Sequence, residues 1–342
     1  MKVLVTGITG FVGSHIAKGF LDLNWEVVGT VRSATKGETL LKQPTFSGAA
    51  QAQQLRYIVV DDLATYDFST RLQDVDAIAH TASPCHFTGK SLDEYITPAV
   101  KGTSNLLMAA RDSPTVKAVA VTSSFGAVLD FRKPALEQSG KTYTEDDWFT
   151  GTYEEAAAQN RAGFWYATSK TLAEREAWRI KDLEGTKWSL ATICPPSIYG
   201  PVIHTSNPDD MNVTSRRLYN IFFGNIKDVI KTDFPAFIDV RDVADAHIKA
   251  ILQRTTDRFL TSAALYDFQK VSDFVHEKFG EEAKRAPIGQ PHHYLKPQQV
   301  YLLDSSKVVN VLGLSMRSFK ETISDTFKNY LQINKDLTSS RS

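Results

Sequence analysis

Close to its start the chain reads VLVTGITGFVG at positions 3–13. The first three of these residues form a short apolar run, which is typical of a buried strand in a parallel sheet. Gly7, Gly10 and Gly13 follow, and residues 14–21 have the pattern of a helix with an apolar face turned inward. In a dinucleotide-binding turn, the first glycine permits the tight turn, the second lets backbone approach a pyrophosphate, and the third lets the helix pack close to the strand. The phosphates would lie at the positive end of the helix dipole. A plain strand-to-helix turn without a ligand is the alternative.

Length and composition indicate a soluble enzyme with two lobes. The chain has 342 residues, of which 42% are hydrophobic and 23% charged, as in ordinary globular proteins. The 39 basic and 39 acidic residues balance, so nothing suggests nucleic acid or an acidic membrane surface as a partner. There is no run of about 18 apolar residues, and Lys2 leads directly into the first strand, so no signal peptide is expected. Cys85 and Cys194 are too few for a disulfide framework or a four-ligand metal site. We therefore expect a cytoplasmic enzyme without a metal.

The end of the second strand carries information about the cofactor. Residues 25–32 (WEVVGTVR) are rich in β-branched residues and predict a strand. Folds that prefer NAD place Asp or Glu about 20 residues after the glycine turn to bind the ribose 2′-hydroxyl. Here the strand ends in Arg32, and Lys36 follows one helical turn later. Two cations in place of a carboxylate favour a 2′-phosphate and hence NADP(H), whereas a solvated surface pair is the alternative.

The next two strands also end in residues suited to a cofactor. Residues 55–60 predict the third strand, and Asp62 just beyond it suits either the adenine amino group or the N-cap of a following helix. The fourth strand begins at Asp76 and runs into the small residues 81–83, which let a cofactor lie close. His80 lies within this apolar run, and we expect it to be a core histidine with satisfied hydrogen bonds.

Strands continue to alternate with helices over the first 190 residues. Helical patterns at 92–111 and 164–181 alternate with strands at 116–121 and 188–193, while 37–54 predicts a loop or a weak helix. This order predicts a Rossmann-type, doubly wound parallel α/β sheet with right-handed crossovers.

After Gly200 the alternation loosens, which indicates a second, smaller C-terminal α/β lobe that binds substrate. We assign residues 1–197 and 237–262 to the dinucleotide-binding domain and residues 198–236 and 263–333 to the substrate lobe. The polar segment 334–342 is expected to be a disordered tail.

Tyr166 and Lys170 are the candidate catalytic pair. They are four residues apart on one predicted helix, so their side chains share a face. Tyrosine titrates near 10, and a lysine ammonium held nearby favours the phenolate, lowers the pKa and makes tyrosine a usable general acid. Ser124, at the carboxyl end of a central strand, can supply a hydroxyl to the same substrate oxygen. A surface coincidence is the alternative, which the glycine turn and the strand-end serine make the weaker one.

These motifs together resemble the extended short-chain dehydrogenases/reductases. The resemblance covers about residues 2–330 and rests on Thr6-Gly7-x-x-Gly10-x-x-Gly13, Thr122-Ser123-Ser124, Tyr166-x-x-x-Lys170, Pro195-x-x-x-x-Gly200-Pro201 and Asp239-Val240-Arg241-Asp242-Val243-Ala244. Within that superfamily, Val31-Arg32-Ser33, His80-Thr81-Ala82-Ser83-Pro84 and Pro98-Ala99-Val100-Lys101-Gly102 resemble the fungal aldehyde/ketone (methylglyoxal reductase-like) branch, near the dihydroflavonol and cinnamoyl-CoA reductases. Ala99 stands where sugar-nucleotide epimerases commonly carry Asn. Pro196-Ser197 after Pro195 is a second departure, and it leaves the nicotinamide contacts open.

The resemblance implies an NADPH-dependent carbonyl reductase that acts on a small-molecule aldehyde or ketone. Ser124, Tyr166 and Lys170 would be the catalytic set, and Lys170 would also hold the nicotinamide ribose. Arg32 and Lys36 would bind the 2′-phosphate, Asp62 and Leu63 the adenine, and Pro195 and Ile198 the nicotinamide amide. The other expected cofactor residues are Gly7, Thr9, Gly10, Phe11, Val12, Thr81, Ala82, Ser83 and Thr122. A homodimer is left open.

Aromatic residues that leave the predicted strand ends suggest an apolar substrate pocket. We expect Phe87, Phe125, Phe131 and Tyr199 to contact substrate, although packing between the lobes is an equal alternative for each ring. The two cysteines are expected near the site as inert lining. Alternative functions are a reductase of dihydroflavonol or cinnamoyl-CoA type and, from a different class, a non-catalytic NADP(H)-binding regulator. The intact catalytic set argues against the regulator.

Overall fold

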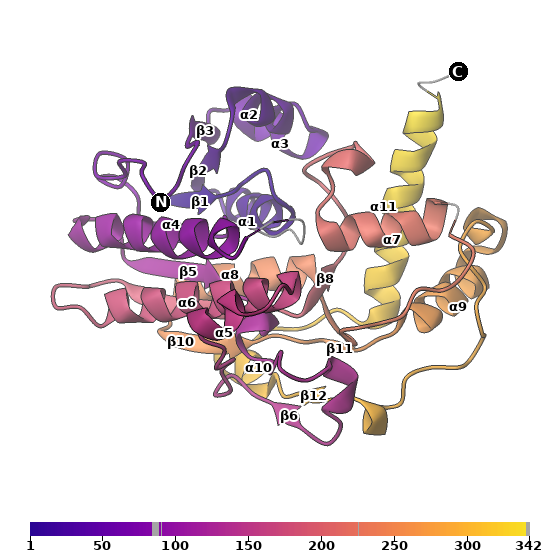
Figure 1. Cartoon of the computed structure of the whole chain (residues 1–342). Helices are drawn as coiled ribbons and strands as arrows, with labels where there is room; N and C mark the ends of the chain where they lie inside the picture. The colour runs from indigo at the N-terminus through magenta and orange to yellow at the C-terminus, as the bar shows by residue number, and fades with distance from the viewer. Residues whose placement is uncertain (84–88, 90, 225, 340–342) are drawn as a thin grey trace.

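Seven parallel strands form the central sheet of this computed structural model, which describes residues 1–83, 89, 91–224 and 226–339 (Figure 1). The strands are β1 (Lys2–Thr6), β2 (Glu26–Val31), β3 (Leu55–Val59), β4 (Ala77–His80), β5 (Ala118–Thr122), β7 (Ser189–Cys194) and β10 (Asp257–Leu260). Their order across the sheet is β10-β7-β5-β4-β1-β2-β3. The direction of winding therefore reverses between β1 and β4, where open α/β sheets form their ligand crevice. The predicted doubly wound parallel sheet is confirmed.

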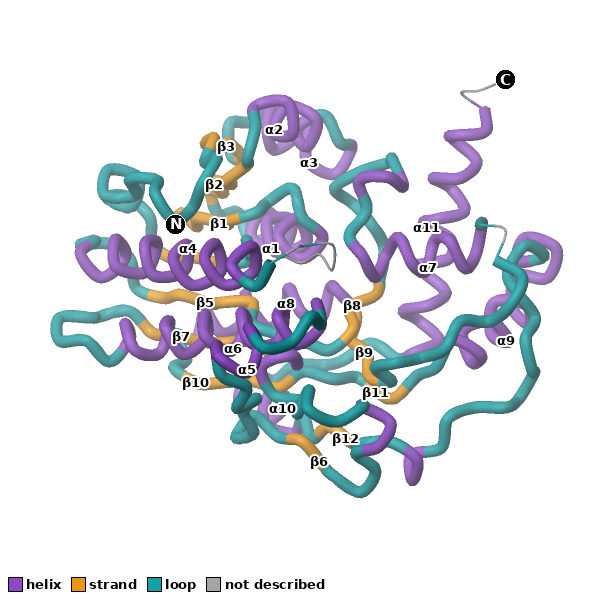
Figure 2. The backbone as a smooth tube through the Cα atoms, viewed as in Figure 1, coloured by secondary structure: helices purple, strands orange, loops and turns teal. Residues whose placement is uncertain are grey.

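Helices cover both faces of this sheet (Figures 1 and 2). On one face, α1 (Phe11–Asp22) packs beside α8 (Val240–Gln253). On the other face, α4 (Asp93–Asp112) packs beside α6 (Ala162–Lys181). Successive side chains of β1 point to opposite faces of the sheet, which explains why an apolar layer forms on each face. Val3 and Val5 pack with Ile16 on the α1 side, whereas Leu4 packs with Leu106 on the α4 side.

The segment between β2 and β3 is helical, so of the two expected alternatives, a loop or a weak helix, the helix is the one that forms. It forms α2 (Ala34–Leu41) and α3 (Pro44–Gln51). Ser33 caps α2 by accepting from the Lys36 amide at 3.5 Å, and Pro44 occupies the first turn of α3, where its missing N–H costs nothing. Leu40 and Phe46 are buried against the same core as α1. Few buried residues hold this segment, so its apolar pattern in the sequence is faint.

A smaller lobe surrounds a three-stranded sheet. Its strands are β8 (Ser197–Tyr199), β9 (Ala236–Asp239) and β11 (Ala264–Leu265), with β9 in the middle, parallel to β8 and antiparallel to β11. Its main helices are α7 (Val213–Phe223), α9 (Phe268–Phe279) and α11 (Phe319–Ser339). Phe222, Phe237, Phe327 and Tyr330 are fully buried in one aromatic-rich core between these elements. This cluster is the hydrophobic core of the smaller lobe, as the apolar layers on its two faces are the core of the large sheet.

An acidic residue at the end of β9 connects the two lobes. Asp239 caps α8 by accepting from the Arg241 amide at 2.9 Å, and its carboxylate also accepts from the Arg241 guanidinium at 2.7 and 2.9 Å. The same guanidinium donates to Asp325 of α11 at 2.8 Å. The Asp239-Val240-Arg241 motif thus joins the small sheet, α8 and α11.

Short elements complete the chain. They are β6 (Thr142–Tyr143) paired with β12 (Leu302–Leu303), α5 (Tyr153–Ala157), α10 (Ser306–Leu312), and the 3-10 turns η1 (Phe125–Ala127), η2 (Ala135–Glu137), η3 (Pro208–Asp210), η4 (Gly280–Ala283) and η5 (Pro297–Gln299). Helix α10 packs through Val308 and Leu312 against α8 and β10, although its residues lie within 263–333, which were expected to belong to the substrate lobe. The boundaries between the two lobes remain a proposal.

The C-terminal segment differs from its prediction. Helix α11 extends through Ser339, which corrects the expectation of disorder from Asn334. Tyr330 and Ile333 are buried in the substrate-lobe core and Leu337 packs against it, so apolar residues at helical spacing hold a segment that looks polar overall.

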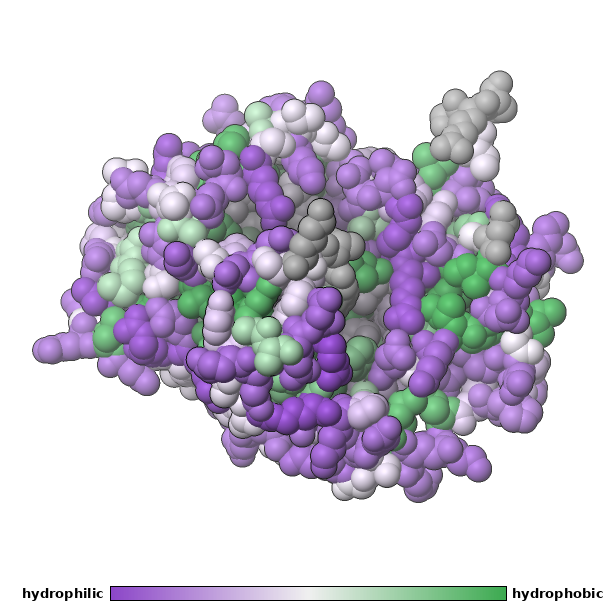
Figure 3. All heavy atoms as spheres, in the orientation of Figure 1, coloured by the Kyte–Doolittle hydropathy of each residue, from purple (hydrophilic) through white to green (hydrophobic). Residues whose placement is uncertain are grey.

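The face shown in Figure 3 is mostly hydrophilic. Within the described ranges, no helix is both long and apolar enough to cross a membrane. In the same residues, no three His, Cys, Asp or Glu side chains gather in an arrangement that would hold a metal ion.

Candidate active site

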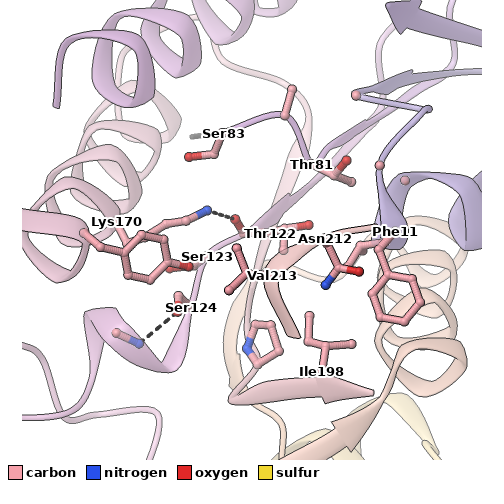
Figure 4. A pocket seen from close by; sticks show the side chains of 18 of the residues that line it. Phe11, Thr81, Ser83, Thr122, Ser123, Ser124, Lys170, Ile198, Asn212 and Val213 are labelled. Carbon is pink, nitrogen blue, oxygen red and sulfur yellow. Dashed lines mark hydrogen bonds between the residues drawn. The ribbon is translucent and has the colours of Figure 1, made fainter. Parts of the chain in front are cut away.

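A cavity of about 660 Å³ lies between the two lobes. Figure 4 shows some of the side chains that line it. The segments that follow β1, β2, β3, β4, β5 and β7 line one side of it, and the start of α7 lines the other. The carboxyl ends of parallel strands therefore meet here, as expected for an open α/β sheet.

The glycine turn packs as closely as its motif requires. Gly7 has φ +68°, which favours glycine, and its amide donates to Thr30 Oγ1 of β2 at 3.0 Å. A Cβ added to Gly13 would lie 2.5 Å from Gly7 O and 2.9 Å from Thr81 Oγ1, so any side chain there would push α1 away from β1. Gly10 precedes α1, and no side chain caps that helix. The first N–H groups of α1 are thus directed toward the cavity without a protein side-chain acceptor.

Two cations lie at the β2 end of the cavity. Arg32 and Lys36 both line it, and both are exposed. Among the described residues, neither forms an ion pair with a carboxylate. An uncompensated pair of cations beside a helix start is a suitable site for a phosphate group.

Asp62 lies between its two predicted roles. Its carboxylate accepts from the Ala64 amide at 2.9 Å and from Thr65 Oγ1 at 3.3 Å, so it caps a turn rather than an α-helix. It also lines the cavity, together with Leu63. The turn holds the carboxylate at the rim of the cavity.

Ser124, Tyr166 and Lys170 meet at the β5 end of the cavity. Figure 4 shows Ser124 and Lys170 there. Lys170 is buried, and its Nζ donates to Thr122 O at the end of β5 at 3.2 Å. Ser124 Oγ accepts from the Gly126 amide at 2.9 Å. A Cβ added to Gly126 would lie 3.2 Å from Ser124 Oγ and 3.3 Å from Tyr166 Cε1, so the serine and the tyrosine ring approach each other around this glycine.

His80 is a core histidine, as predicted. Its ring nitrogens lie 2.8 Å from Thr6 Oγ1 and 3.1 Å from Thr103 Oγ1. Burial, with a smaller contribution from the positive charge of Lys170, lowers the pKa of His80 to about 3. The ring is therefore neutral at physiological pH and supports β1 and β4 from behind the cavity.

The structure brings together all the residues predicted to bind the cofactor. Each of them lines the cavity; they are Gly7, Thr9, Gly10, Phe11, Val12, Arg32, Lys36, Asp62, Leu63, Thr81, Ala82, Ser83, Thr122, Tyr166, Lys170, Pro195 and Ile198. Their individual roles remain proposals.

The predicted substrate residues divide into three groups. Phe125 and Phe131 line the cavity, although Phe125 is also buried against Tyr143 and Tyr301. Tyr199 does not line it, which corrects the prediction: its ring turns into the substrate-lobe core, where its hydroxyl lies 2.7 Å from that of Tyr266. Burial also raises the pKa of Tyr199 well above its ordinary value. Phe87 lies outside the described residues.

Cys194 differs from its prediction in position but not in reactivity. Cys194 ends β7 but does not line the cavity; it is buried behind it, with Sγ 3.6 Å from Glu174 Oε2. Burial raises the pKa of this thiol to about 12, so it stays protonated at neutral pH and is inert. Cys85 lies outside the described residues.

Sequence reasoning missed the residues that the substrate lobe contributes. Asn212, Val213 and Thr214 at the start of α7 line the cavity, as does Phe234, whose ring centroid is 5.7 Å from that of Phe131. Thr214 Oγ1 donates to Ile198 O at 2.8 Å, which ties α7 to β8. Asn212 directly before a helical pattern is a helix-start signal, but no local pattern in the sequence indicates that this helix start faces the cavity.

Comparison with known proteins agrees with this geometry. The profile of the NAD dependent epimerase/dehydratase family matches residues 3–259. A ketoreductase of Aspergillus niger is 33% identical over 344 residues, which cover 97% of this chain and 98% of that protein. The NADPH-dependent methylglyoxal reductase of Saccharomyces cerevisiae is 31% identical over 354 residues, which cover 97% of this chain and 98% of that protein.

A solved structure agrees over the same length. The crystal structure of the yeast methylglyoxal/isovaleraldehyde reductase complexed with NADPH matches with a TM-score of 0.86 and 28% identity, covering 98% of this chain and 99% of that one. The family profile covers well over half of the chain, and the relatives cover nearly all of it. The protein therefore belongs to the NAD-dependent epimerase/dehydratase family, the extended short-chain dehydrogenases/reductases.

Proposed function

We propose that this protein is an NADPH-dependent carbonyl reductase that converts aldehydes and ketones to alcohols. One observation carries the proposal: Ser124, Tyr166 and Lys170 line the same cavity as the glycine turn and the two uncompensated cations. Ser124 follows β5 and Arg32 follows β2, three strand spacings away in the sheet. At about 4.8 Å per spacing this separation is roughly 14 Å, which suits an extended dinucleotide with its two ends at the two groups.

The residues present fit NADPH. The N-terminus of α1 has no side-chain cap, and the glycine turn leaves no room for a Cβ at Gly13, so backbone N–H groups are open to a pyrophosphate. Arg32 and Lys36 would hold the 2′-phosphate. Asp62 and Leu63 would hold the adenine, Lys170 the nicotinamide ribose, and Pro195 with Ile198 the nicotinamide amide.

The catalytic step follows from three side chains. Bound NADPH supplies the hydride that passes to the carbonyl carbon. Tyr166 gives its phenolic proton to the carbonyl oxygen, and the ammonium of Lys170 stabilises the phenolate that this transfer leaves. Ser124 donates a hydrogen bond to the same oxygen and orients it. These donors are in place before the reaction, so charge that develops on the oxygen is stabilised without reorganisation.

The lining at the catalytic end favours apolar substrates. Phe125, Leu129, Phe131, Val213 and Phe234 all line the cavity, and the last is 40% exposed. Sites lined by apolar and aromatic groups with few polar anchors bind apolar ligands. We therefore propose branched or aromatic aldehydes and keto esters as substrates in preference to UDP-sugars. The methylglyoxal and isovaleraldehyde reductases among the relatives support small carbonyl compounds as the general class.

A substrate screen tests the function. Purified protein with NADPH should consume the cofactor, followed by its absorbance, when methylglyoxal, isovaleraldehyde, aryl aldehydes or keto esters are added. The alcohol should be recovered in equal amount. A panel of dihydroflavonols and CoA thioesters serves as a comparison. Turnover of a nucleotide sugar with no carbonyl reduction would overturn the proposal.

The proposal also covers the location of the protein in the cell and its oligomeric state. A cytoplasmic location follows from the sequence expectation, and fluorescence microscopy of the tagged protein tests it. Whether the chain forms a homodimer is decided by light scattering coupled to size-exclusion chromatography.

A further inference from the structure

Glu174 continues the catalytic face of α6 into the protein interior. Tyr166, Lys170 and Glu174 are each four residues apart on this helix, so their side chains lie in one row. The first two line the cavity, whereas Glu174 is fully buried behind it. Lys170 and Glu174 also border a second, water-sized cavity with Ser123.

Four N–H and O–H donors from three strand segments satisfy the Glu174 carboxylate, and the Cys194 thiol adds weaker contacts at 3.6 and 3.8 Å. Ser123 Oγ donates to Oε2 at 2.5 Å, and Thr192 Oγ1 of β7 donates to Oε1 at 2.7 Å. Arg258 of β10 donates through Nε to Oε1 at 2.7 Å and through Nη2 to Oε2 at 3.3 Å. A buried ion pair contributes little net stability, even when its hydrogen bonds are satisfied. Its main effect is therefore on what it holds in place.

Arg258 extends this network around the segment that carries Ser124. Its guanidinium donates to Ala127 O at 3.2 Å and to the carbonyls of Glu145 and Asp147 at 2.6 and 2.5 Å. Its Cζ lies 3.6 Å from the centre of the Trp148 ring, so the planar group is held on its face as well as at its edges. An arginine fixed in this way is a rigid part of the scaffold.

The ion pair thus holds the catalytic serine from both sides. Ser123, directly before Ser124, is bound by Glu174, and Ala127, three residues after it, is bound by Arg258. We propose that Glu174 and Arg258 are positioning residues, which act through Ser123 and Ala127 to keep the Ser124 hydroxyl at the oxygen that Tyr166 protonates. This inference rests on the proposed carbonyl reductase function.

Single hydroxyl deletions test the inference, because removal of Glu174 itself would leave Arg258 buried without its partner and threaten folding. Ser123→Ala removes one donor to Glu174 beside the catalytic serine. Thr192→Val removes another donor to the same carboxylate, but on β7, and is the matched control. Each variant is assayed with NADPH and isovaleraldehyde, alone and combined with Ser124→Ala. NADPH affinity, measured by quenching of tryptophan fluorescence, and the melting temperature are recorded for all.

We expect Ser123→Ala to lower kcat about tenfold, since a misplacement of about 1 Å at a reacting group can cost on the order of 100-fold. NADPH affinity should stay within about twofold, and Thr192→Val should change kcat by less than about twofold. In the Ser124→Ala background, Ser123→Ala should have no further effect on kcat, because it acts through the missing hydroxyl.

Three results would overturn the inference. These are an unchanged kcat in Ser123→Ala, equal losses in Ser123→Ala and Thr192→Val, or the same loss from Ser123→Ala with and without the Ser124 hydroxyl. A wild-type protein without carbonyl reduction would instead contradict the proposed function, and with it this inference. Full turnover in Ser124→Ala alone would contradict the catalytic role of the serine.

Discussion

Arg32 and Lys36 are exposed cations without ion-pair partners among the described residues, so a phosphate bound there would gain charge-assisted contacts. Loss of one such contact costs roughly 1.5–3 kcal/mol, or about tenfold to a hundredfold in affinity. Arg32→Ala should therefore weaken NADPH binding by that order and leave NADH binding nearly unchanged, as measured by fluorescence titration. Lys42→Ala, at the other end of α2 and outside the cavity, is the matched control. Equal losses for both cofactors in Arg32→Ala would refute the 2′-phosphate role.

Phe234 is the better probe of substrate shape than Phe125. Phe125 packs with Tyr143 and Tyr301 in a core, so its deletion would cost stability before it reported on substrate. Phe234 is exposed and lines the cavity beside Phe131. Phe234→Ala should lower kcat/KM for an aryl aldehyde about tenfold and for methylglyoxal much less, because only the larger substrate reaches the ring.

Steady-state kinetics with the two substrates measure this difference. Tyr294→Ala removes an equally exposed aromatic ring that lies outside the cavity, and it should change neither value. If Phe234→Ala affected both substrates alike, the ring would not define the substrate end.

Helix α1 owes its position to a glycine. A Cβ at Gly13 would meet Gly7 O at 2.5 Å, a backbone atom that cannot rotate away, whereas a Cβ at Gly48 in α3 would meet nothing within 4 Å. Gly13→Ala should move α1 from β1, lower the melting temperature and weaken NADPH binding more than tenfold, roughly the loss of one charge-assisted contact. Gly48→Ala should instead stabilise the protein by about 0.5–1 kcal/mol, since alanine has the higher helix propensity. Calorimetry and fluorescence titration distinguish the two, and normal NADPH affinity in Gly13→Ala would contradict the phosphate turn.

The elements that sequence predicts well are those with a local pattern. Val3 to Val5, the three glycines and the row Tyr166, Lys170 on α6 each follow a short period that fixes which face they present. The start of α7 is different: Asn212 reaches the cavity only because the small sheet returns the chain to it. Tyr199 was misplaced for the same reason, because its place near a strand end does not say which side of β8 it takes.

At the scale of the whole molecule, buried histidines couple folding to pH. Burial lowers the pKa of His15, His204 and His247 to about 4 and that of His80 to about 3. The unfolded chain binds protons at these groups below about 6.5, whereas the native state does not until pH 4 or lower. Each group therefore contributes stability above pH 6.5 that falls by about 1.4 kcal/mol per pH unit below it.

One carboxyl opposes this trend. Burial raises the pKa of Asp242 to about 6, so between pH 6 and its ordinary value the native state takes up the proton and gains stability as the pH falls. Four histidines outweigh one aspartate, and we expect the free energy of unfolding in urea to decrease from pH 7 to pH 5. A free energy that stayed constant or increased over this interval would show that the histidines are protonated in the native state.

The Ser124, Tyr166 and Lys170 cluster lines the cavity between the two lobes of the molecule, and a single-turnover experiment with Tyr166→Phe tests its chemistry. This change keeps the ring and removes the proton donor. NADPH affinity should stay near the wild-type value, while the rate of hydride transfer to isovaleraldehyde, followed by loss of bound NADPH absorbance, should fall by at least about 10²–10⁴-fold. A near-normal rate in the folded, NADPH-binding variant would mean that the proton comes from another group.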